Sequence, residues 1–145
     1  MTCQCCVEPS DVQVALEQGG RAAPPIDPAA AVEIAASQLA ATGVIVGRVT
    51  RFRERVGGAA GATRPASVAF EVSLFNAGTG RRLWRGQFDE TQPAVTENVA
   101  RVRQYPGRGG RWLSANELAR WGAERMVQNL LSGAERGQTE GAAPQ

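Results

Sequence analysis

Residues 67–91, SVAFEVSLFNAGTGRRLWRGQFDET, decide the fold. Large apolar side chains alternate with small or polar ones over the first part, which is typical of a β-strand with one buried face. Residues 82–91 carry Trp84 and Phe88 and predict a second strand. The connection between them, NAGTG at residues 76–80, is short and contains glycine. The stretch therefore predicts an antiparallel β-hairpin.

Upstream of the hairpin, the sequence predicts a further strand. Residues 44–56, VIVGRVTRFRERV, begin with a β-branched run and become rich in arginine. This pattern predicts a strand that is buried at its start and solvent-exposed at its end. Residues 57–65, which connect this strand to the hairpin, consist mainly of glycine and alanine and are predicted to form a loop.

Two helices are predicted before these strands. The first covers residues 11–18, with Ser10 as its N-cap. The second follows Asp27 as N-cap, has Pro28 in the first turn, and ends near Gly43. Its predicted buried face is formed by four apolar residues at helical spacing: Val32, Ala35, Ala36 and Leu39.

A final helix is predicted after a long irregular segment, residues 92–110. Ser114 and Glu117 fit the capping box S-x-x-E, which marks a helix start. An apolar stripe follows on one side of the helix: Leu118, Ala119, Gly122, Ala123, Met126, Val127 and Leu130. The order helix, helix, three strands, helix favours an α/β (α+β) fold. We expect a three-stranded or larger mixed sheet with a central antiparallel hairpin, flanked by about three helices.

The chain length favours one domain. Its 145 residues, of which 43% are hydrophobic and 21% charged, suit a single globular unit. Residues 132–145 contain no large apolar side chain and cannot bury enough surface to offset the entropy of ordering. We therefore expect a single domain over residues 7–131, a disordered N-terminus over residues 1–6 and a disordered tail over residues 132–145.

The ionisable residues exclude much catalytic chemistry. The chain has no histidine, so triads built on histidine and zinc sites that contain it are excluded. All 16 positive residues are arginine, and the net charge is only +2. One explanation of the exclusive use of arginine is a coding bias. The alternative is selection for bidentate contacts to carboxylates or phosphates. We expect no enzymatic activity and no cofactor.

The three cysteines lie within the first six residues. Cys3, Cys5 and Cys6 form a C-x-C-C cluster, but no further cysteine or histidine is available as a fourth ligand. Three thiolates fall short of a closed zinc site, and their odd number argues against a closed disulfide framework. We therefore expect no metal site.

Arginines gather at the end of the predicted strand over residues 44–56. They are Arg48, Arg51, Arg53 and Arg55. One interpretation is a solvated strand end that is balanced by Glu54 and by acidic residues of neighbouring strands. The other is a patch for phosphates or lipid head groups. Asp89 and Glu90 are adjacent on a strand, so they point to opposite faces and are expected to pair with arginines rather than to share a substrate.

A second basic stretch, YPGRGGRW at residues 105–112, precedes the final helix. It is either a surface loop anchored by Trp112 and Leu113, or a contact for a partner, because exposed arginine and aromatic side chains are typical of binding hot spots. The candidate partner-binding residues are accordingly Tyr105, Arg108, Arg111, Trp112, Arg51 and Arg53.

The strand and hairpin motifs together resemble a group of bacterial envelope lipoprotein domains. The residues that carry this resemblance are VIVGRV at 44–49, NAGTG at 76–80 and the pair Leu83-Trp84. The group comprises the curli-secretion channel lipoprotein, lipoprotein activators of penicillin-binding proteins, and the TolB amino-terminal type of domain. The resemblance covers residues 7–131 and describes a fold more than a site.

The resemblance implies a non-catalytic interaction or assembly module of the cell envelope. Its expected partners are other proteins or copies of itself. Its expected location is the periplasm, in association with the outer membrane, and it would contact the membrane only through a lipid anchor. Such domains open with a strand and a long helix, which a signal peptide and a lipobox precede. Residues 1–10 carry neither a charged nor an apolar signal region. We therefore expect the sheet to lack part of the family's strands and to expose an edge that could pair with another chain.

The alternative interpretation of function is a cytosolic, arginine-rich nucleic-acid-binding protein. It would use the basic strand end together with the segment GRGGRW at residues 107–112. The net charge of +2 argues against it, because proteins that bind nucleic acids usually carry a strong positive field. A small-molecule substrate is not expected.

Overall fold

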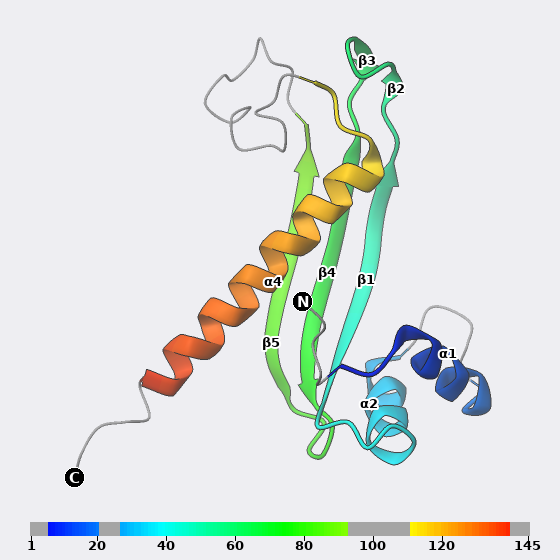
Figure 1. The fold of residues 1–145 in the computed structure, drawn as a ribbon, viewed down its shortest axis with the longest axis vertical. Coiled ribbons are helices and arrows are strands. Elements are labelled where there is room, and N and C mark those ends of the chain that lie inside the picture. Colours follow the sequence, from blue (N-terminus) through cyan, green and yellow to red (C-terminus); the bar gives the residue numbers. More distant parts are fainter. Residues whose placement is uncertain (1–5, 21–26, 93–110, 140–145) are drawn as a thin grey trace. The chain divides into compact units, whose positions relative to one another are not determined.

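A computed structural model describes residues 6–20, 27–92 and 111–139, with side chains described as far as residue 133 (Figure 1). The elements are, in order, α1 (Pro9–Gln18), α2 (Pro28–Ser37), β1 (Gly43–Arg53), β2 (Val56–Gly57), β3 (Ala62–Arg64), β4 (Ser67–Asn76), β5 (Arg82–Thr91) and α4 (Ala115–Thr139). The predicted α+β class is confirmed.

No helix in the described part of the chain is both long and apolar enough to cross a bilayer.

The three long strands form one antiparallel sheet in the order β1-β4-β5, with β4 in the middle (Figure 1). The predicted hairpin is formed by β4 and β5. Its turn is closed by backbone hydrogen bonds from Asn76 N to Arg81 O at 2.9 Å and from Gly80 N to Asn76 O at 2.8 Å. The Asn76 Oδ1 atom also accepts a bond from Thr79 N at 2.9 Å. The local turn chemistry thus produces the connection that the sequence predicts.

The predicted loop over residues 57–65 contains a small antiparallel ladder, which the composition did not indicate. β2 pairs with β3, with Val56 opposite Arg64 and Gly57 opposite Ala62. Gly57 has a φ of 106°, and a Cβ atom there would lie 2.6 Å from Gly61 O. Glycine is therefore required at this position, since both the backbone conformation and the close approach exclude a side chain.

Contacts within the chain divide it into two compact units. Unit 1 comprises Met1–Arg48 and Val72–Arg85, and unit 2 comprises Val49–Glu71 and Gly86–Gln145. The long strands contribute residues to both. The single domain over residues 7–131 therefore stays a prediction, and the two units are described separately.

Unit 1 contains the two short helices. α1 begins at Pro9 with Glu8 as N-cap, two residues earlier than the predicted cap at Ser10, because a proline at the first helical position already has a helical φ. α2 has Asp27 as N-cap and Pro28 at its start, as predicted, but it ends at Ser37. Its buried residues are Ala30, Ile34 and Ala35.

The predicted buried face of α2 was therefore only partly correct. Ala35 is buried, whereas Ala36 is exposed and Val32 and Leu39 are half-buried. The apolar run AAAVEIAAS has alanines all round the helix, so the pattern did not distinguish the side that carries Ile34. Ile34 packs against α1, where a Cβ on Gly19 would lie 3.0 Å from Ile34 Cδ1.

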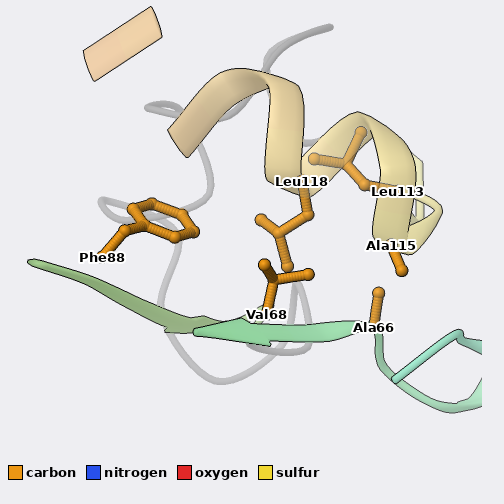
Figure 2. Packing of buried hydrophobic residues seen from close by; sticks show 6 residues of the cluster. All are labelled: Ala66, Val68, Phe88, Leu113, Ala115 and Leu118. Atoms are coloured by element: carbon orange, nitrogen blue, oxygen red, sulfur yellow. The ribbon is translucent and has the colours of Figure 1, made fainter. Parts of the chain in front are cut away.

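Unit 2 holds a core between α4 and the strands (Figure 2). Buried residues of β4, β5 and the start of α4 form it, together with residues that directly precede these elements: Ala66, Val68, Phe88, Leu113, Ala115 and Leu118. Phe88 contacts two further aromatic rings, with centroid distances of 5.1 Å to Phe70 and 5.8 Å to Trp121. Figure 2 shows Leu118 above Val68, with Leu113 just before α4 and Ala115 at its first residue.

The predicted capping box starts α4. Glu117 N donates to Ser114 Oγ at 3.2 Å, and Ser114 N donates to Glu117 Oε2 at 2.8 Å. The helix continues to Thr139 and so includes residues 132–139, which were expected to belong to a disordered tail. Residues 140–145 and residues 1–5 lie outside the described part of the chain.

Candidate interaction surface

The most exposed apolar strand of unit 2 lies at a border of the sheet. We call residues Val49–Val56 the edge segment; it comprises the second half of β1 and the link into β2. Its three large apolar side chains are exposed, with Val49 at 64%, Phe52 at 53% and Val56 at 49%. In the sheet of described strands β1 has a neighbour, β4, on one side only. An outer strand presents unpaired backbone N–H and C=O groups to a further strand.

Arg51, one of the predicted binding residues, is held against the sheet. Its Nε atom donates to Ser67 Oγ at 2.6 Å, and its guanidinium pairs with the Asp89 carboxylate. The Ser67 hydroxyl also shares a hydrogen bond of 2.6 Å with the Thr91 hydroxyl. The side chain thus spans from β1 across β4 to β5. The prediction that Asp89 pairs with a nearby arginine is confirmed.

Glu54 and Arg55 join the edge segment to the start of α4. The Glu54 carboxylate accepts hydrogen bonds from Ala115 N, at 3.1 Å to each oxygen, and from Arg55 N at 2.8 Å. A carboxylate at a helix N-terminus satisfies an otherwise unpaired N–H group and interacts favourably with the helix dipole. Arg55 Nη1 donates to Trp112 O at 2.5 Å and lies 4.0 Å from Glu117 Oε2. Both Glu54 and Arg55 therefore have structural partners.

Arg111 forms a bidentate pair with Glu117. The distances are 3.0 Å from Nη1 to Oε2 and 2.6 Å from Nη2 to Oε1. Hydrogen bonds from Arg111, and then from the backbone of Ser114, lower the pKa of Glu117 to about 2. The same bond to Glu117 raises the pKa of Arg111. The pair fixes the chain that enters α4.

Gln92, which the sequence did not single out, joins the end of β5 to the same place. It is buried, and its Nε2 atom donates to Arg111 O at 3.0 Å. Its Oε1 atom accepts a 2.7 Å bond from the N–H of Leu113, which is fully buried. Trp112 is half-buried, and its backbone N–H donates to Ala59 O at 2.9 Å.

The predicted binding residues therefore fall into three groups. Arg51, Arg111 and Trp112 make the internal contacts described above, and their role in partner binding stays a prediction. Arg53 is exposed, and among the described residues it has no hydrogen bond or ion pair through its side chain. Tyr105 and Arg108 lie outside the described residues.

The exposed apolar residues of the edge segment were the part of the surface that the sequence analysis missed. Residues 49–56 were predicted to be a solvated strand end because of their arginines. The available signal was the interspersion of Val49, Phe52 and Val56 with those arginines, since a strand end that faces water alone does not need large apolar side chains.

No cluster of three metal-binding side chains occurs among the described residues. Cys6 is exposed, and Cys3 and Cys5 lie outside the described ranges. The expectation of no metal site and no cofactor stays a prediction. The hydrogen-bonded residues around the start of α4 have partners that explain them as parts of the fold, so the edge segment is the candidate interaction surface.

Comparison with known proteins gives one structural likeness. No protein-family model matches the chain, and no curated protein matches it significantly. The structure is similar to that of a PelC variant, a dodecamer from Paraburkholderia phytofirmans, with 28% sequence identity and a TM-score of 0.34. The match covers 60% of this chain and 61% of that one, so this chain spans about three fifths of the PelC length.

Proposed function

We propose that the chain is a non-catalytic interaction module that associates with another protein chain through its edge segment. The observation that supports this most is the exposure of Val49 and Phe52 on an outer strand of the sheet, continued by the exposed Val56 at the start of β2. Proteins usually protect an outer strand against pairing with another chain by charged side chains, bulges or prolines, or by covering it with another element. Here the large apolar side chains remain exposed between the charged ones.

The envelope location belongs to the same proposal. The strand VIVGRV and the hairpin turn NAGTG resemble those of bacterial envelope lipoprotein domains, in which protein assembly is the expected role. We propose that the chain acts in the periplasm, as part of a lipoprotein assembly. The nucleic-acid alternative receives less support, because Arg51, Arg55 and Arg111 are each engaged by a carboxylate or a carbonyl of the chain.

The test compares association before and after the edge segment is altered. Light scattering on the purified chain measures self-association, and co-purification with a bacterial envelope fraction measures partner binding. Val49→Glu places a charge on the edge segment and is expected to abolish whichever association the wild type shows. Val127→Glu is the matched control, because Val127 on α4 is 54% exposed and lies outside the edge segment.

Loss of association in Val49→Glu alone supports the proposal, provided that thermal unfolding shows both variants to be folded. Equal behaviour of the wild type and both variants in the two measurements would contradict it. Binding of a single-stranded oligonucleotide, with steep salt dependence, would instead favour the nucleic-acid alternative.

A further inference from the structure

We infer that the edge segment accepts an extended, acidic strand of a different protein, which adds to the sheet beside β1. This inference rests on the proposed function and specifies its partner. The backbone of β1 would supply main-chain hydrogen bonds. The exposed Val49 and Phe52 point to opposite faces of β1 and would each contact apolar side chains on the same face of the added strand. The charges around the edge segment determine which kind of strand fits.

The carboxylates of unit 2 that contact the edge segment or belong to it are already engaged. Asp89 pairs with Arg51. Glu54 accepts hydrogen bonds from the N–H groups of Ala115 and Arg55. Glu117 pairs with Arg111 and lies near Arg55. These carboxylates are therefore already engaged by the donors named here and do not pair with the other arginines of the region.

Two arginines of the same region remain without such a partner. Arg53 follows Phe52 directly, and Arg64 lies opposite Val56 in the β2–β3 ladder. Both are exposed, and among the described residues neither side chain has a hydrogen bond or an ion pair. An added strand beside β1 that carries carboxylates between apolar residues would neutralise Arg53, because opposite charges on adjacent strands stabilise their pairing. Arg64 lies one strand further away, on β3, and adds only to the positive charge of the region.

A second copy of β1 fits this surface less well. β1 contains Arg48, Arg51 and Arg53 but no acidic residue. Pairing it with another β1 would bring guanidinium groups of two chains close together, and like charges on adjacent strands are destabilising. Charge complementarity therefore favours a different, acidic chain over self-pairing.

The experiment uses two capped peptides as probes, TVEVTVEVT and its basic counterpart TVKVTVKVT, in titrations with the full chain. We expect the acidic peptide to bind with a dissociation constant about tenfold or more below that of the basic peptide, and the difference to shrink at high salt. Arg53→Glu is expected to reduce or reverse this preference. Arg120→Glu is the matched control, because Arg120 is an exposed arginine on α4.

Several outcomes would overturn the inference. Equal binding of both peptides, or an unchanged preference in Arg53→Glu, would exclude charge recognition by the edge segment. Competition by a single-stranded oligonucleotide would show that the arginines bind polyanions in general. If light scattering gives a stable homodimer that Val49→Glu dissociates, the partner is a second copy. In that case the proposed function survives, whereas the inference about its partner fails.

A variant that fails to fold does not decide the question, so Arg53→Gln is included as a second, milder substitution. It removes the charge without reversing it, and it is expected to lower the preference for the acidic peptide while leaving the thermal unfolding unchanged. Retention of the full preference in folded Arg53→Gln would contradict the inference.

Discussion

At the scale of single residues, Gly122 of α4 contacts the ring of Phe88 directly. A Cβ atom at this position would lie 2.7 to 2.8 Å from three ring carbons. Alanine favours a helix by about 1 kcal/mol over glycine, but overpacking a core costs about 1–3 kcal/mol. We expect Gly122→Ala to destabilise the protein by up to about 2 kcal/mol in urea unfolding. The Phe88→Leu background is the control: the same substitution should be neutral or stabilising there, and equal effects in both backgrounds would contradict the packing argument.

Glu117 predicts a pH dependence. Its pKa is lowered from 4.5 to about 2 in the folded chain, mainly by Arg111. The folded state therefore binds this proton less tightly than the unfolded state, so the stabilisation is present above pH 4.5 and is lost as the pH falls toward 2. Because the side chain is 39% exposed, solvent screening reduces the effect. Glu117→Gln should show a weaker decline of the unfolding free energy in this window than the wild type does.

At the scale of elements, Gln92 connects the end of β5 to the start of α4. Replacing it by alanine removes the acceptor of the buried Leu113 N–H. An unsatisfied buried donor costs about 1–3 kcal/mol. We therefore expect Gln92→Ala to lower the unfolding free energy by at least about 1 kcal/mol. Gln87→Ala, at an exposed position of β5, is the control and should have little effect. Equal losses in both variants would mean that the hydrogen bonds of Gln92 contribute nothing beyond the truncation of a side chain.

The elements also show which parts of the fold could be predicted. The β4–β5 hairpin and the capping box of α4 were predicted because their signals lie within a few residues of each other. The β2–β3 ladder was missed, since two paired residues on each side leave no periodic pattern. The buried start predicted for the strand over residues 44–56 was wrong, since Ile45 is 59% exposed. Burial in a strand depends on whether a neighbouring strand or helix covers it, which the strand's own residues do not show.

At the scale of the whole molecule, the two units bury different kinds of side chain. The buried apolar residues of unit 1 are mostly alanines, together with Ile34, whereas unit 2 buries Val68, Phe88, Leu113 and Leu118. Larger buried side chains contribute more free energy through the apolar area that they remove from water. We expect amide hydrogen exchange in α1 and α2 to be faster than in β4 residues 67–71 and in the first turns of α4. Slower exchange in α1 and α2 would show that unit 1 gains its stability from another source.

The three tryptophans are distributed between the two units. Trp84 belongs to unit 1, and Trp112 and Trp121 belong to unit 2, where Trp121 meets the Phe88 ring edge-on and Arg125 lies 5.0 Å above it. Replacing the indoles of one unit by phenylalanine leaves emission from the other unit alone. Each unit thus has its own tryptophan fluorescence. Followed during denaturation, the two signals distinguish one cooperative unfolding transition from two successive transitions.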